Sequence, residues 1–178
     1  VFYGDQADGC GGAGQETAEA PPSYQLTVYK PWEMPGWLPG ALVYQIFPDR
    51  FYNPYDRPLP LPPGALIHSS WNQPPLYARA GDTGEILGYD FFGGNLPGIQ
   101  AKLAYLADLG VRAIYCNPLF SAVSNHKYDT GDYETIDAGF GGEMALVELC
   151  REAARYGIRV LLDGVFSHTG SDSRYLNK

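Results

Sequence analysis

Short apolar runs alternate with amphipathic stretches from residue 41 onward. The runs at residues 41–47, 111–116 and 158–162 have the length of strands that are buried on both faces. Between them, residues 95–109 and 143–156 carry apolar side chains at helical spacing, and a glycine follows each stretch. The order strand, helix, strand, helix, strand predicts an α/β fold with a parallel sheet.

Each predicted helix has one apolar face. Asn95 is a candidate N-cap of the first helix, and Pro97 lies in its first turn. The predicted faces consist of Leu96, Ile99, Leu103 and Leu106 on the first helix and of Met144, Val147, Cys150 and Ala154 on the second. We expect these faces to pack against the sheet.

The chain before residue 41 has a different character. Residues 1–22 are rich in glycine, alanine and acids without a hydrophobic period, which predicts a loop or frayed end. Residues 24–29 alternate and predict a strand, and residues 31–39 hold three prolines and read as a linker. A proline-rich loop covers residues 53–63, and a long excursion follows at residues 67–87, with a candidate hairpin around residues 81–84.

Polar residues follow the predicted strands. Asp49 and Arg50 follow the first strand, Asn117 the second, and Asp163 the third, with His168 five residues later. The carboxyl ends of parallel strands are where α/β folds keep their chemistry, whether in a barrel or a doubly wound sheet. No glycine-rich phosphate loop follows the first strand, which argues against nucleotide binding.

Composition and charge narrow the classes of ligand that fit this chain. The formal net charge of -8 argues against nucleic acid and anionic membranes as partners and is compatible with a neutral ligand such as a sugar. The fourteen tyrosines suit both packing and sugar stacking. The three cysteines form no metal-binding pattern, and we expect Cys116 and Cys150 to be small buried hydrophobes.

Targeting signals are missing from the sequence. It contains no signal peptide and no apolar stretch long enough to span a membrane. The chain does not begin with methionine and reads as part of something longer, so both a cytoplasmic and a secreted location stay open.

Five ordered stretches resemble the α-amylase superfamily of glycoside hydrolases, in particular its neopullulanase, cyclomaltodextrinase and pullulanase-like branch. They are LVYQIFPDRF (residues 42–51), YDFFGGNLPGI (89–99), LADLGVRAIYCNPLF (106–120), SNHKYDTGDYETID (124–137) and DGVFSHTG (163–170). The resemblance implies that residues 41–178 form the N-terminal portion of a (β/α)8 TIM barrel, strands one to three of a fold that needs about 250 residues. Residues 1–40 would be a linker and the remnant of an N-terminal β domain.

The resemblance implies an activity as well. Members cleave α-glucosidic bonds in starch-like glucans or maltodextrins with retention, using a nucleophile after strand four and an acid after strand five. This chain would hold neither group and would be inactive alone. Two alternatives stay open: a branching or cyclising glucan transferase, and a non-catalytic sugar-binding barrel.

Three residues match positions with roles in that family, and a fourth lies beside one of them. His168 matches the histidine that hydrogen-bonds the 6-hydroxyl of the sugar at the cleavage subsite, and Tyr128 matches the tyrosine that stacks under this sugar. His126 would line the same pocket. Asp163 matches the acid that holds an arginine and so orients the nucleophile.

The resemblance requires no cofactor, and Ca²⁺ is the single candidate. Ser167 stands where many members have a calcium-binding asparagine, which weakens one site. A second site would involve Asn53, Gly93 and Asn95, where the family has a carboxylate at the last position. We also expect the open edge of the third strand to make the isolated chain marginally stable or self-associating.

Overall fold

The computed structural model describes residues 1–5, 14–20, 30–56, 58–76, 81 and 88–176. The chain divides into two compact units, Val1–Pro35 and Gly36–Lys178. In the first, β1 (Phe2–Gly4) pairs antiparallel with β2 (Gln15–Thr17), so the expectation of a structureless N-terminus is wrong for these residues. Cys10, the predicted strand at 24–29 and most of the predicted hairpin at 81–84 lie outside the described residues.

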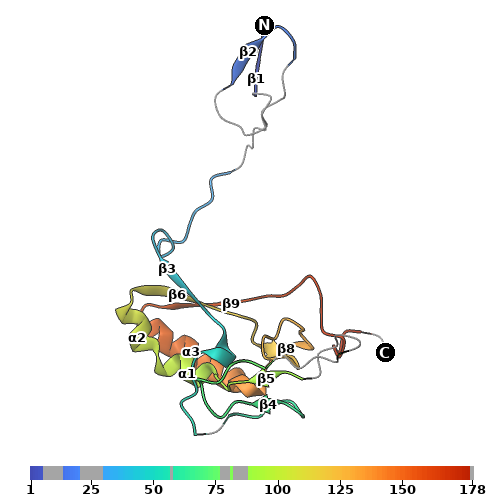
Figure 1. Ribbon diagram of the computed structural model, residues 1–178. Coiled ribbons are helices and arrows are strands. Elements are labelled where there is room, and N and C mark those ends of the chain that lie inside the picture. The colour runs from blue at the N-terminus through green and yellow to red at the C-terminus, as the bar shows by residue number, and fades with distance from the viewer. Residues whose placement is uncertain (6–13, 21–29, 57, 77–80, 82–87, 177–178) are drawn as a thin grey trace. The chain divides into compact units, whose positions relative to one another are not determined.

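A parallel sheet organises the second unit. It consists of β3 (Leu42–Ile46), β6 (Val111–Cys116) and β9 (Arg159–Leu162), in the order β3-β6-β9. The helices α1 (Leu96–Ala101), α2 (Leu103–Asp108) and α3 (Gly142–Arg155) gather on one face of this sheet (Figure 1). A doubly wound sheet reverses its strand order and covers both faces. Sequential order with one covered face is the barrel arrangement, and the predicted βαβαβ order is confirmed.

The first predicted helix is confirmed with a break. Asn95 caps α1, because its side-chain oxygen accepts from the backbone N–H of Gly98 at 2.9 Å. Lys102 separates α1 from α2. The predicted apolar face is buried, with Leu96, Ile99, Leu103 and Leu106 each at most 1% exposed.

The predicted face of α3 is wrong. Met144 and Val147 are 70% and 51% exposed, and Cys150 is exposed too, whereas Leu149 and Ala153 are fully buried. The helix carries two neighbouring apolar stripes, and it turns the one containing Leu149 toward α1 and β9. Cys116, in contrast, is buried as expected.

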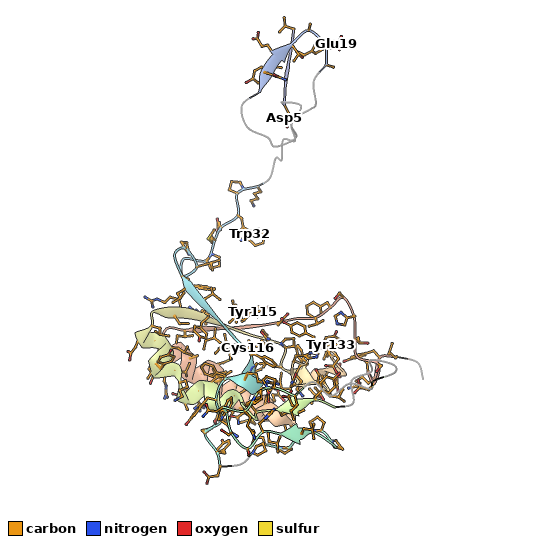
Figure 2. All side chains as sticks on the ribbon, in the orientation of Figure 1. Asp5, Glu19, Trp32, Tyr115, Cys116 and Tyr133 are labelled. Atoms are coloured by element: carbon orange, nitrogen blue, oxygen red, sulfur yellow. The ribbon has the colours of Figure 1, made fainter. Side chains whose placement is uncertain are left out.

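The face of the sheet opposite the helices is open. Val43, which pairs with Ala113 on the same face as Tyr115, is 43% exposed, whereas the next residue along β6, Cys116, points to the opposite face (Figure 2). Cys116 joins the core under the helices. In a (β/α)8 barrel the open face becomes the packed interior.

Short elements shape the long loops that follow the strands. β4 (Leu66–Ile67) pairs parallel with β5 (Asp90–Phe91), and β7 (Phe120–Ser121) pairs antiparallel with β8 (Asp132–Ile136). Single 3-10 turns occur at Pro48–Arg50 and Ala138–Phe140. Within the described part of the chain, no helix has the length and apolar character needed to cross a bilayer.

Candidate functional site

Asp163 and Tyr128 meet beyond the carboxyl ends of β6 and β9. Asp163 directly follows β9, and its backbone N–H donates to the carbonyl of Cys116 at 3.1 Å. The hydroxyl of Tyr128 donates to Oδ2 of Asp163 at 2.9 Å. Burial, together with this carboxylate, raises the pKa of Tyr128 to about 12. A hydrogen bond to Asp163 also raises the pKa of Tyr115. Both phenols therefore stay protonated and can serve Asp163 as donors.

His126 lies beside Tyr128 as a neutral ring. Its Nδ1 accepts from the backbone N–H of Tyr128 at 3.1 Å, which places the proton of the neutral ring on Nε2. Burial lowers the pKa of His126, an effect that the nearby Asp129 carboxylate only partly opposes. The ring centroid is 5.9 Å from those of Tyr89 and Tyr128. His126 thus supplies one N–H donor within an aromatic group, a combination suited to a sugar.

His168 lies in the loop after β9 with an exposed side chain. Its Nδ1 is 3.0 Å from the Ser167 hydroxyl, and its backbone carbonyl accepts from the hydroxyl of Tyr133 at 2.8 Å. Among the described contacts, none joins the His168 ring to Tyr128 or Asp163. The structure therefore brings Tyr128, His126 and Asp163 together, whereas the exposed ring of His168 contacts only Ser167 among the described contacts.

Comparisons with known proteins identify the family of this chain. The catalytic-domain model of α-amylases matches residues 45–178. This chain belongs to the α-amylase family. It is 45% identical over 190 residues to an amylopullulanase of Thermoanaerobacterium saccharolyticum, covering all of this chain and 15% of that protein. It is 43% identical over 139 residues to a cyclomaltodextrinase of Geobacillus thermopakistaniensis, covering 78% of this chain and 21% of that protein.

A solved structure extends the match to the fold. The cyclic α-maltosyl-(1→6)-maltose hydrolase of Arthrobacter globiformis superimposes with a TM-score of 0.66 at 35% identity, covering 80% of this chain and 29% of that one. This chain therefore spans less than a third of the length of these relatives. It forms part of the (β/α)8 barrel of an α-amylase-family protein, as the sequence predicts.

A buried ion pair holds the site segment of this α-amylase-family chain, and sequence reasoning did not predict it. Lys127, between His126 and Tyr128, is 1% exposed and has a positive φ of 60°. Its ammonium lies 2.7 Å from Oδ2 of Asp137 and 2.8 Å from the carbonyl of Ala122. His126 and Tyr128, on either side of the buried Lys127, are half-buried.

A second network fixes the start of the same segment. Asp90 accepts from Arg50 at 2.8 Å and contacts Nε2 of His68 at 2.7 Å. Burial by itself would raise the pKa of Asp90, but hydrogen bonds from Leu76, His68 and Arg50 outweigh it and lower that pKa. The side chain of Asn125 donates to the carbonyl of Asp90 at 2.7 Å, which ties the segment to β5. The position of Arg50 after a predicted strand singled it out in the sequence. Its hydrogen-bond partners could not be predicted in the same way.

The positions expected to bind Ca²⁺ come together without fitting the ion. Asn95 is fully buried and donates its amide N–H groups to Oδ1 of Asn53 at 3.1 Å and to the carbonyl of Gly93 at 3.2 Å. The Oδ1 of Asn95 already accepts a hydrogen bond from the backbone N–H of Gly98. An amide nitrogen therefore faces the two oxygens that a cation would need. No cluster of three or more acidic, histidine or cysteine side chains able to hold a metal occurs within the described ranges.

Proposed function

We propose that this chain supplies the sugar-binding half of a retaining glycoside hydrolase that acts on α-glucosidic bonds in maltodextrins or starch-like glucans. The contact between Tyr128 and Asp163 carries the proposal, because it joins the loops after β6 and β9 into one surface at the carboxyl end of the sheet. The names of the relatives, amylopullulanase and cyclomaltodextrinase, support the substrate class. The barrel part begins near residue 41 in this proposal, after a linker and the remnant of an N-terminal β domain.

Each side chain has a role that suits its surroundings. The ring of Tyr128 offers a flat apolar surface to a pyranose, while its hydroxyl is committed to Asp163. The Nε2–H of neutral His126 and the exposed ring of His168 donate to sugar hydroxyls. Asp163 accepts a hydrogen bond from the Tyr128 hydroxyl here, and in this proposal it holds a cation from the remaining barrel. The nucleophile and the acid come from outside these residues, about 5 Å apart if the configuration is retained.

Measuring reducing ends released from pullulan, cyclodextrin and soluble starch tests this proposal. The 178-residue chain and the full-length protein are assayed in parallel, with His168→Ala in the latter. We expect activity in the full-length protein alone, and a roughly tenfold loss of kcat/KM in the variant, equivalent to one hydrogen bond of about 1.4 kcal/mol. Longer glucan products without new reducing ends would indicate a transferase. Binding without any turnover would indicate a non-catalytic barrel.

We further propose that the isolated chain associates through its open sheet. Val43, Leu162 and Phe166 are 43%, 42% and 85% exposed on or beside β3 and β9, the two outer strands of the sheet. Exposed strand edges and apolar faces favour pairing with another chain. Sedimentation of the isolated chain is expected to show an average mass that rises with concentration. A sharp thermal melt of a monomer, independent of concentration, would contradict this.

A further inference from the structure

The loop that carries His168 lies along the segment that carries Tyr128. Its far end is fixed by backbone hydrogen bonds from Gly170 to the carbonyl of Thr130 at 2.9 Å and from Arg174 to the carbonyl of Gly131 at 3.1 Å. Its near end is fixed by the hydrogen bond between Tyr128 and Asp163. The turn from Val165 to His168 lies between these two attachments.

Tyr133 reaches into this turn from β8. Its hydroxyl contacts the carbonyl oxygens of both Val165 and His168, the latter at 2.8 Å. Its ring lies among aromatic neighbours, with centroids 5.8 Å from Phe120, 6.1 Å from Phe166 and 5.6 Å from Tyr175. Figure 2 places Tyr133 beside the loop that follows β9. The hydroxyl thus bridges the first and last carbonyls of a four-residue turn.

The base of Tyr133 is itself held in place. Its backbone N–H donates to the hydroxyl of Tyr175 at 3.0 Å, and that hydroxyl donates to Oδ1 of Asp132 at 3.2 Å. Arg174 pairs with the same Asp132 carboxylate at 3.0 Å. Tyr133 is therefore held by contacts that involve Tyr175, Asp132 and Arg174, and none of these three residues lies in the turn.

We infer that Tyr133 is a positioning residue that sets where the His168 ring stands. The ring is exposed, and among its described contacts it meets only the neighbouring Ser167, so the backbone must define its position. The Tyr133 hydroxyl contacts that backbone at the carbonyl of His168 and at the carbonyl of Val165, three residues earlier. The inference rests on the proposed role of His168 in binding a glucosyl unit.

The substitution Tyr133→Phe separates positioning from packing. Phenylalanine keeps the ring among Phe120, Phe166 and Tyr175 and removes only the hydroxyl. The carbonyl of exposed His168 can then bond water, so the melting temperature should fall by less than about 4 °C. The turn loses its bridge, and we expect the Kd for maltotriose to rise and kcat/KM on maltooligosaccharides to fall, each about fivefold.

A double-mutant cycle in the full-length protein provides the test, with Tyr133→Phe, His168→Ala and the double variant. Tyr105→Phe, on the exposed surface of α2, is the matched control and should behave as wild type. If Tyr133 acts through His168, the double variant will bind and turn over no worse than His168→Ala.

The outcomes separate the two proposals. Additive losses in the double variant would show that the hydroxyl acts elsewhere and would overturn this inference while leaving the role of His168 intact. Wild-type behaviour of Tyr133→Phe would overturn it equally. Wild-type behaviour of His168→Ala would instead overturn the proposed role of His168, and with it the basis of the inference.

Discussion

Replacing Lys127 by methionine is expected to lower the free energy of unfolding by about 3–5 kcal/mol, as for removal of one partner of a buried ion pair. The change keeps most of the side-chain volume but leaves the Asp137 carboxylate, whose residue is 7% exposed, without its cation. It also removes the ammonium from above the rings of Phe91 and Phe140, whose centroids are 5.8 and 5.4 Å away. Urea unfolding of the variant and wild type measures the difference.

Two further variants make this test specific. Lys30→Met, at an exposed position, should change the stability by less than about 0.5 kcal/mol. The double variant Lys127→Met with Asp137→Asn should be more stable than the sum of the single effects implies, because it leaves no lone buried charge. A loss below about 1 kcal/mol for Lys127→Met would contradict the structural role. Weaker maltotriose binding should accompany the loss, since Lys127 connects His126 to Tyr128.

Gly98→Ala is expected to destabilise the protein by about 3 kcal/mol or more. A Cβ atom at this position would lie 1.9 Å from the carbonyl oxygen of Tyr52 and 2.7 Å from its carbon. Alanine is the better helix former by about 1 kcal/mol, but that gain is small against an overlap with backbone atoms. The same Tyr52 carbonyl accepts from the backbone N–H of Asn95 at 3.2 Å, so it cannot move without breaking the start of α1.

Gly88→Ala is the matched control for this substitution. Nothing lies within 4 Å of a Cβ atom built there, and its backbone conformation is open to other residues. Stability should stay within about 1 kcal/mol of wild type, with a small gain expected from the stiffer unfolded chain. Thermal melts of the two variants should differ widely, and equal melting temperatures would show that α1 shifts freely past the loop after β3.

The elements that sequence predicts well here are those with one consistent pattern. The strands β3, β6 and β9 follow continuous apolar runs, and the cap at Asn95 follows from its side chain and the proline after it. The prediction of the buried face of α3 was wrong because the helix carries two apolar stripes. Only packing against the neighbouring α1 and β9 decides which of them is buried. The pairings of β1 with β2 and of β7 with β8 depend on partners that local patterns do not reveal.

The same distinction separates the site residues that could be predicted from those that were missed. Tyr128, His126 and Asp163 could be chosen because each lies in a stretch that resembles a known motif, and the structure brings these three together. Lys127 and Tyr133 were missed, since their importance lies in partners ten and thirty-five residues away along the chain. A lysine or a tyrosine in a polar loop reads as a solvated side chain until its partner is known.

The residues of the proposed sugar-binding surface lie close together along the chain, which bears on the order in which the protein is made. All of its members lie between His126 and His168, and the ion pair and hydrogen bonds that hold them close within Gly36–Lys178. Chains fold from their N-terminal side as the ribosome releases them, and contacts close in sequence form first. If these residues bind the sugar as proposed, its recognition is encoded in a segment that can be assembled during translation, and later strands would be added to a surface already shaped for its ligand.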